Sequence, residues 1–380
     1  MRATGLVFHD SYLSHDPGEA VIGTPAEPYP YDEPVPPWEH PLRVKRLKEL
    51  LDRSGLAEQL TDVAPRPAEL EDVGRFHTRA YINRVLAVAA GGGGDAGLNA
   101  RLSRGGFEVA LLAAGGSIAA VESVLDGRVQ SCYALVRPPG HHAMRETGMG
   151  FCIFNNVAVA ALHALERQRA ERILIVDWDV HHGNGTQQAF YADRRVLFIS
   201  LHQEGLYPEN SGLVEETGEG DAEGTTVNLP LPAGTGDAGY LAAFERVVVP
   251  IARQFKPDLV LVSSGLDASR FDPLGRMVVS CEGFRQMARH LRELADDFAG
   301  GRMAVLHEGG YSLSYAPFCG LAIVEEMAGT RTGLTDRADP DRSARLRPSY
   351  EVGLDVDRAL REIIAFQSKY WHLSAPVATV

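Results

Sequence analysis

Six short apolar runs that alternate with helical segments are the feature that most limits how this 380-residue chain can fold. The runs are rich in Val, Ile and Leu with little polar alternation, which is typical of strands buried on both faces. They cover residues 132–136, 173–178, 196–202, 226–231, 259–264 and 303–308. Amphipathic stretches lie between most of them, at 155–168, 237–254 and 282–298. This repetition predicts an α/β fold in which helices cover a parallel sheet.

Three segments lie outside this pattern. Residues 15–39 are rich in Pro, Gly and acids, and we expect an insertion or extended arm there because frequent prolines forbid a regular helix. Residues after about 330 are expected to form a less regular tail, with helical character in 354–370. No linker separates two blocks of strands and helices, so residues 1–380 are predicted to form a single domain.

The segment at 41–55 has apolar residues at helical spacing and is predicted to form a helix. It carries four basic residues, Arg43, Lys45, Arg46 and Lys48. Acidic residues interrupt this cluster, so we expect a solvated helix face rather than a binding patch.

Charge and composition exclude several classes of function. The chain has 37 Lys+Arg and 50 Asp+Glu, a net charge of −13, which argues against a nucleic-acid or anionic membrane surface and leaves room for cationic partners. The apolar stretch at 109–121 is too short to span a bilayer and is expected to form a buried helix. Four scattered cysteines, and a start without the apolar core of a signal peptide, predict a cytoplasmic location.

The strongest candidate site follows the run at 173–178. Asp177, Asp179 and His181 are spaced by two, so an extended backbone points them to one face. Asp267 follows another run and reaches the same sheet edge, although an Asp at a strand end is also a common helix cap. Asp179, His181 and Asp267 would leave a position open for water or substrate, as in catalytic metal sites. Such nitrogen and oxygen ligands favour Zn²⁺, with Fe²⁺ or Mn²⁺ as alternatives.

Two further segments supply groups for proton transfer. His141 and His142 follow a Pro-Pro-Gly turn, and adjacent histidines on a rigid turn suit general acid–base chemistry. Tyr311 follows two glycines after the last apolar run and could donate its hydroxyl to an oxyanion. Taken singly, these residues are also common in ordinary loops, so the prediction rests on their combination.

Together these segments resemble the histone deacetylase superfamily, in particular its class II and bacterial amidohydrolase branch. The matching segments are RPPGHHA (137–143), GFCIFNN (150–156), VDWDVHHGNGTQ (176–187), ISLH (199–202), DASRFDPLG (267–275) and EGGY (308–311). The resemblance runs from about residue 40 to about residue 330. It implies an arginase-like α/β domain with a central, mainly parallel sheet of about eight strands.

The resemblance also implies roles for the site residues. Asp179, His181 and Asp267 match the ligands of one catalytic zinc ion, and His141 and His142 match the paired catalytic histidines.

Three further positions match groups around the histidines and the substrate carbonyl. Asp177 matches the carboxylate that orients His141. Asn184 stands where class I members carry Asp behind the second histidine, and Asn there is similar to class II. Tyr311 matches the tyrosine that helps the metal polarise the carbonyl. Vertebrate class IIa enzymes carry His at this place and deacetylate poorly, so Tyr311 favours deacetylase activity.

Four residues stand at positions that line the substrate entrance in the family, and two of them match its pattern. Gly150, through its backbone carbonyl, and Phe151 match tunnel positions. Tyr207 stands where the family usually has a second Phe, which implies a more polar tunnel. Leu274 stands where polyamine deacetylases of this branch carry a Glu gatekeeper. We therefore expect an acylated lysine, in a protein, peptide or small molecule, rather than an acetylpolyamine.

A second ion and two rival functions complete the expectations. A structural K⁺ site is implied by Asp177, Asp179, His181, Ser200 and Leu201. Cys152 is expected to be a free thiol beside the tunnel. The alternative function is an acetylpolyamine or other small-molecule amidohydrolase, and a more distant one is an acyl-lysine binder without activity. The 15–39 arm could exchange between subunits of a homo-oligomer or pack on its own chain.

Overall fold

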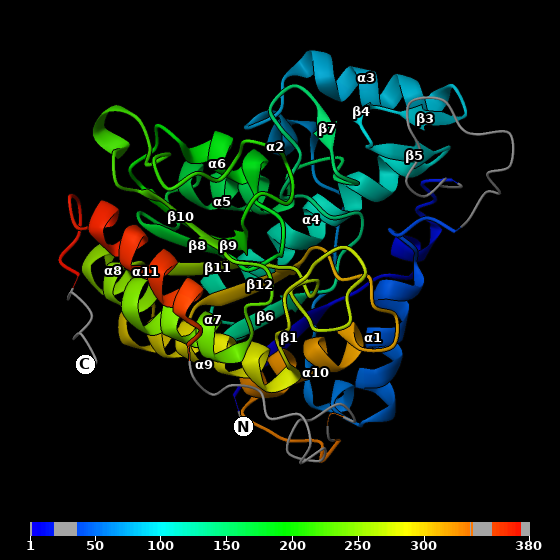
Figure 1. The fold of residues 1–380 in the computed structure, drawn as a ribbon. Coiled ribbons are helices and arrows are strands. Elements are labelled where there is room, and N and C mark those ends of the chain that lie inside the picture. Colours follow the sequence, from blue (N-terminus) through cyan, green and yellow to red (C-terminus); the bar gives the residue numbers. More distant parts are fainter. Residues whose placement is uncertain (1, 19–35, 335, 337–351, 374–380) are drawn as a thin grey trace, which may run out of the picture.

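The computed structural model describes residues 2–18, 36–334, 336 and 352–373, and its centre is one eight-stranded sheet (Figure 1). Across the sheet the strands are β10 (Thr226–Leu231), β9 (Val196–Gln203), β8 (Ile173–Asp177), β11 (Leu259–Ser264), β12 (Met303–His307), β6 (Ser131–Ala134), β1 (Thr4–Val7) and β2 (Thr61–Asp62). Every pairing between neighbours is parallel. The predicted parallel sheet is confirmed.

Six of these strands coincide with the predicted apolar runs to within two residues at either end. The other two, β1 and β2, were not predicted. β1 has only four residues, all buried, and β2 has two exposed residues, so neither is long enough to show a periodic pattern.

Helices cover both faces of the sheet (Figure 1). One face carries α2 (Leu70–Gly74), α3 (Arg79–Ala90), α4 (Gly106–Leu125), α5 (Asn156–Glu166) and α6 (Asn184–Phe190). The other carries α1 (Leu42–Arg53), α7 (Asp237–Ala243), α8 (Val249–Phe255), α9 (Cys281–Phe298), α10 (Ala316–Ala328) and α11 (Leu354–Gln367). A π-helical turn (Phe244–Val248) joins α7 to α8. The three predicted amphipathic helices are therefore present, the second with this interruption.

The sheet separates two apolar cores because its side chains alternate between the faces. In β8, Leu174 and Val176 belong to one core, whereas Ile173 and Ile175 belong to the other. All four side chains are fully buried. The run therefore shows no polar alternation, since neither face of the strand meets water.

Smaller elements complete the described part. Short strands lie outside the main sheet: β3 (Gly93–Asp95), β4 (Gly97–Leu98), β5 (Arg101–Ser103) and β7 (Gly148–Met149). Three short 3₁₀ helices are η1 (Asp10–Ser14), η2 (Ala57–Gln59) and η3 (Gly220–Ala222).

The apolar stretch at 109–121 is part of α4, a 20-residue helix. The expectation that it is too short to span a membrane was wrong, because the helix extends beyond the stretch at both ends and reaches sufficient length and hydropathy. The expectation of a buried helix is confirmed, since 78% of its most apolar window lies inside the structure. One such helix is typical of a protein core.

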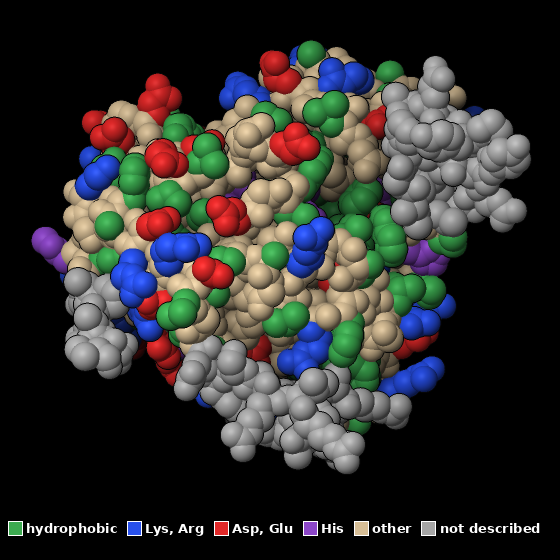
Figure 2. Space-filling view, viewed as in Figure 1, with side chains coloured by type: hydrophobic (Ala, Val, Ile, Leu, Met, Phe, Trp, Pro, Cys, Tyr) green, Lys and Arg blue, Asp and Glu red, His purple; other side chains and the backbone are tan. Residues whose placement is uncertain are grey.

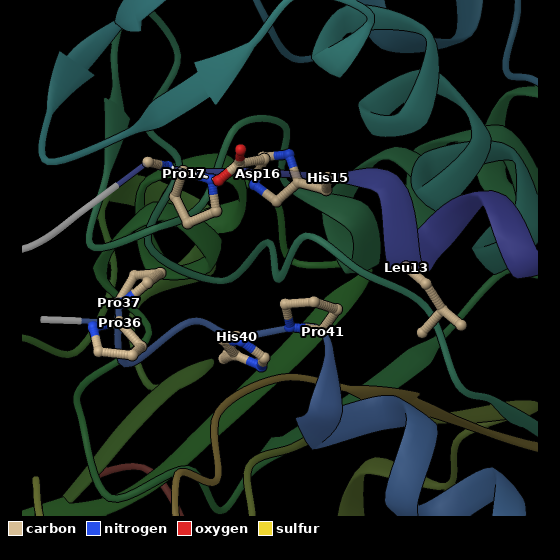
Figure 3. A pocket seen from close by; sticks show the side chains of 9 residues that line it. Leu13, His15, Asp16, Pro17, Pro36, Pro37, His40 and Pro41 are labelled. Atoms are coloured by element: carbon tan, nitrogen blue, oxygen red, sulfur yellow. Dashed lines mark hydrogen bonds between the residues drawn. The ribbon is translucent and has the colours of Figure 1, made fainter.

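The two ends of the 15–39 arm converge on one buried side chain, Arg137. Its guanidinium donates to the carbonyl of His15 at 2.7 Å and to the carboxylate of Glu39 at 2.7 Å. Residues 19–35 of the predicted arm lie outside the described residues. A pocket of about 420 Å³ lies between the two anchored ends, and Figure 3 shows the side chains that line it. It is lined by Leu13, His15, Asp16, Pro17, Gly18, Pro36, Pro37, His40 and Pro41.

The predicted helical part of the C-terminal tail is α11. Arg246 donates to the carboxylate of Asp357 at 2.7 Å, and the Trp371 indole donates to the carbonyl of Gly224 at 2.8 Å. These contacts attach the helix and the residues after it to the α/β body. The remainder of the tail, at 335, 337–351 and 374–380, lies outside the described residues.

Candidate metal and catalytic site

The chemically active side chains follow β8, β11, β12 and β6, which are consecutive in the sheet. Because the pairings are parallel, the carboxyl ends of these strands share one edge. Segments that are far apart in the sequence meet there, as predicted from their positions directly after strands.

Asp179, His181 and Asp267 form a compact group whose candidate ligand atoms all lie within 4.8 Å of one another. The Nδ1 of His181 lies 2.9 Å from Asp179 Oδ1 and 3.3 Å from Asp267 Oδ2. Asp267 Oδ2 is buried and has no hydrogen-bond partner in the described structure. A buried carboxylate oxygen of this kind is stabilised by a cation, so the group fits a metal ion.

Backbone groups hold the other carboxylate oxygens of this group. The N–H of Gly309 donates to Asp179 Oδ2 at 2.9 Å, and the N–H of Val180 donates to Asp267 Oδ1 at 2.8 Å. The alternative that Asp267 caps a helix is wrong, because among the described residues the next helix is α9, which begins at Cys281.

Two glycines leave the space that these carboxylates occupy. A Cβ on Gly265 would lie 2.1 Å from Asp179 Oδ2, and a Cβ on Gly309 would lie 2.1 Å from Asp267 Oδ2. Both distances are far below van der Waals contact. The site is therefore shaped by backbone that approaches the carboxylates closely, which only glycine permits.

His141 is paired with a carboxylate. Its Nδ1 lies 2.9 Å from Asp177 Oδ2, and both side chains are buried. Burial by itself lowers the pKa of His141, but Asp179 and Asp177 outweigh it and raise the pKa well above its usual value. This arrangement favours an imidazolium at His141.

His142 is paired with an amide instead. Its Nδ1 lies 2.8 Å from the amide oxygen of Asn184, which is the first residue of α6. Burial lowers the pKa of His142 well below its usual value, and the neighbouring cationic ring of His141 lowers it further. The two adjacent histidines, 4.0 Å apart between ring centroids, thus differ in their favoured charge.

Tyr311 lies on the loop between β12 and α10, after the carboxyl end of β12. The carboxylate of Asp272 accepts hydrogen bonds from the backbone N–H groups of Tyr311 and Ser312, at 2.6 and 3.1 Å. Burial raises the pKa of the Tyr311 hydroxyl well above its usual range, so the hydroxyl stays protonated and can donate.

Arg43 was not recognised from the sequence as part of the site. The expectation of a solvated helix face was wrong for this residue, which is only 4% exposed. Its guanidinium donates to the carbonyls of Gly310, at 2.8 Å, and of Glu308, and its carbon lies 4.7 Å from the centre of the Tyr311 ring. Its Nη1 also donates to Glu39 at 2.7 Å. Arg43 therefore binds the backbone just before Tyr311 and helps to fix the position of this loop.

Glu308 is a second residue that the sequence did not single out, although it begins the EGGY segment. Its Oε2 accepts hydrogen bonds from the N–H groups of Gly140, at 2.6 Å, and His141, at 3.2 Å. Its side chain is fully buried, and burial raises its pKa to about 7. Glu308 thus ties the histidine turn to the loop that carries Tyr311.

The predicted tunnel residues surround these groups. The ring of Tyr207 stands perpendicular to His142, with 5.0 Å between centroids, and Phe151 lies 5.9 Å from Tyr311 in an edge contact. A Cβ on Gly150 would lie 2.6 Å from His142 and 3.0 Å from Tyr207, so the backbone passes close to both rings.

Four other predicted positions have different surroundings. Leu274 is half-buried, and its N–H donates to Asp272 at 2.9 Å. Ser200 is the strand partner of Asp177 in the β8–β9 register, and Leu201 follows it, fully buried. The predicted K⁺ set thus includes three residues on two adjacent strands, Asp177 on β8 and Ser200 and Leu201 on β9. Cys152 is a buried free thiol, with its Sγ 3.5 Å from the carbonyl of Gly150.

Acidic and basic side chains are interspersed on the face shown in Figure 2. On this face the described basic side chains do not gather into one broad patch.

Comparison with known proteins decides the relationship. Residues 37–327 match the family described as "Histone deacetylase domain". The chain belongs to the histone deacetylase family. Histone deacetylase-like amidohydrolase of Pseudomonas aeruginosa is 42% identical over 345 residues, covering 88% of each chain. A probable deacetylase of Archaeoglobus fulgidus is 38% identical over 377 residues, covering 97% of this chain and 98% of its own.

Solved structures agree with the family assignment. The crystal structure of the HDA15 HD domain superposes with a TM-score of 0.84 at 32% identity, covering 98% of this chain and 96% of that chain. The arginase-like α/β fold implied by the resemblance is therefore confirmed. As a family member, the protein is a deacetylase or amidohydrolase.

Proposed function

We propose that this member of the histone deacetylase family is a Zn²⁺-dependent enzyme that removes acetyl or other acyl groups from the side-chain amine of acyl-lysine. The observation that carries the proposal is the pair His141 and His142 beside the group Asp179, His181 and Asp267. Two histidines with opposite favoured charges next to an N/O metal group match the needs of metal-assisted amide hydrolysis.

Asp179, His181 and Asp267 would hold the metal. When bound, Zn²⁺ supplies positive charge that polarises the amide carbonyl and lowers the pKa of a water molecule towards about 7.

The proton steps belong to the chain's own residues. The Nε2 of neutral His142 accepts a proton from the attacking water and later returns it to the leaving amine. Cationic His141, oriented by Asp177, stabilises negative charge nearby. The hydroxyl of Tyr311 donates to the developing oxyanion of the substrate.

The substrate class follows from the tunnel residues. Phe151 and Tyr207 offer ring faces for the aliphatic part of an acyl-lysine, and the Gly150 carbonyl offers an acceptor for its amide. Leu274 provides no carboxylate to bind a second ammonium group, which favours acyl-lysine over acetylpolyamines.

Two measurements test the proposal. Removing metal with EDTA should abolish hydrolysis of an acetyl-lysine peptide, and stoichiometric Zn²⁺ should restore it better than Fe²⁺ or Mn²⁺. A side-by-side assay of acetyl-lysine peptide and acetylspermidine should give the higher kcat/KM for the peptide. Unchanged turnover after metal removal would refute zinc dependence, while a clear preference for acetylspermidine would support the small-molecule amidohydrolase instead. Binding of acetyl-lysine without turnover in the zinc-loaded protein would identify a non-catalytic binder.

Three further assignments belong to this proposal. A structural K⁺ ion is proposed at Asp177, Asp179, His181, Ser200 and Leu201, supported by the strand pairing of Asp177 with Ser200. A cytoplasmic location is supported by the four free thiols. Neither a nucleic acid nor a membrane is proposed as a partner, and a homo-oligomer is a proposal that awaits measurement of the solution mass.

A further inference from the structure

Two buried cysteines from different helices face each other away from the proposed catalytic site. Cys281 is the first residue of α9 and Cys319 lies in α10. Their sulfur atoms are 3.6 Å apart, although the residues are 38 positions apart in the sequence. This separation is close to van der Waals contact between two sulfur atoms. It is longer than the bond of about 2.05 Å in a disulfide, so both cysteines are free thiols here.

The two helices hold this approach in place. The guanidinium of Arg285 in α9 donates to the carbonyl of Ala322 at 3.0 Å and to the carboxylate of Glu325 at 2.6 Å, both in α10. All four thiols are buried, but Cys281 is 6% exposed whereas the other three are 0% exposed. Cys281 is therefore the only one of the four cysteine residues with exposed surface, and we expect a small oxidant to react there first.

We propose that Cys281 and Cys319 form a reversible disulfide when the protein meets a small peroxide. Hydrogen peroxide oxidises the Cys281 thiol to a sulfenic acid and releases one water. The Cys319 thiol then attacks that sulfur, the S–S bond forms, and a second water leaves. Two thiols are thereby oxidised while one peroxide is reduced to two waters.

The order of the two steps follows from their surroundings. Burial raises the pKa of the Cys319 thiol well above its usual range, so this thiol makes a poor first nucleophile towards the oxidant. It can act second because its partner is already within 3.6 Å.

The disulfide would join the helices that follow two loops of the site. α9 follows the loop from Asp267 to Ser280, and α10 follows the loop that carries Tyr311. Tyr315 connects the two places, since its hydroxyl accepts a hydrogen bond from the N–H of Cys281 at 3.4 Å. The disulfide would therefore restrain the end of the Tyr311 loop that leads into α10. It does not depend on the proposed function.

The test uses the full chain treated with hydrogen peroxide, then alkylated under denaturing conditions and mapped by mass spectrometry. The expected product is a reducible link between the peptides of Cys281 and Cys319, with Cys132 and Cys152 still alkylated. We expect oxidation to raise the Tm by several degrees and to slow amide hydrogen exchange in residues 309–315. Oxidation of Cys132 or Cys152 before any such link, or a link that leaves both Tm and exchange unchanged, would overturn the proposal.

Matched variants distinguish the Cys281–Cys319 disulfide from general oxidation of the protein. Cys281→Ser and Cys319→Ser should each abolish both the link and the rise in Tm. Cys132→Ser should retain both, because Cys132 lies in β6, away from the pair. A rise in Tm that survives either of the first two substitutions would contradict the assignment.

Discussion

The Nδ1 of His142 lies 2.8 Å from the amide oxygen of Asn184. An amide oxygen only accepts hydrogen bonds, so Nδ1 carries the hydrogen and the lone pair of a neutral ring is on Nε2. His141, by contrast, faces the carboxylate of Asp177 at 2.9 Å. The two neighbouring histidines thus have partners that favour different charge states. His142 is favoured as a neutral base and His141 as a cation.

Asn184→Asp should move the pH dependence of the reaction. A carboxylate at this position favours the imidazolium, so the pKa of His142 rises and the base is protonated up to a higher pH. We expect the acidic limb of the kcat/KM profile to shift upward by about one unit. Steady-state assays across the pH range check this, and an unmoved limb would show that His142 is not the group that titrates.

Tyr311→Phe removes one donor to the oxyanion and should lower kcat by about 100-fold or more, about 3 kcal/mol. The zinc content should not change, because the hydroxyl is outside the proposed ligand group. Elemental analysis together with single-turnover assays measures both. Tyr207→Phe serves as the control, since it alters the tunnel wall and should act mainly on KM. Full turnover in Tyr311→Phe would remove this hydroxyl from the mechanism.

Gly309→Ala should weaken metal binding. The added Cβ would lie 2.1 Å from Asp267 Oδ2 and 2.6 Å from Asp179 Oδ2, so at least one carboxylate has to move. We expect a loss of metal affinity of about 10- to 100-fold, by analogy with changes around other metal sites. Competition with a zinc chelator measures it.

Gly74→Ala provides the matched control for that experiment. Gly74 is the last residue of α2, and no other group lies within 4 Å of the position that an added Cβ would take. This variant should bind zinc as the wild type does. Equal zinc affinities in the two alanine variants would contradict the proposed role of the glycine backbone.

Glu39→Gln should destabilise the protein in a pH-dependent manner. Burial acts to raise the pKa of Glu39, but Arg137 and Arg43 outweigh it and lower the pKa from 4.5 to about 2. A depressed carboxyl pKa contributes stability that is present above about pH 4.5 and is lost as the pH falls towards 2. At neutral pH we expect a loss of about 3 kcal/mol in the free energy of unfolding.

Denaturant titrations of both proteins at several pH values check the Glu39 prediction. The difference between wild type and Glu39→Gln should shrink as the pH falls below about 4.5. A difference that stays constant over this range would mean that the charge of Glu39 contributes nothing to stability.

The sequence alone was sufficient to predict the main strands and the strand ends at which the candidate site residues lie. Buried parallel strands have continuous apolar runs, and polar residues directly after such runs must lie at one sheet edge. For the same reason Asp179, His181 and Asp267 could be grouped from their positions in the chain, since each follows a strand. These signals are local, and so they can be read from spacing.

Only the tertiary structure revealed the buried residues that contact the site from distant parts of the chain. Arg43 has the sequence context of a solvated helix face, yet its guanidinium meets carbonyls of residues 265 and 267 positions away. Glu308 and the Cys281–Cys319 pair are likewise defined by partners on other elements. Helical periodicity indicates which face of a helix packs, but a long charged side chain can turn inward wherever distant backbone offers acceptors. Such contacts exist only once the sheet has brought its loops together.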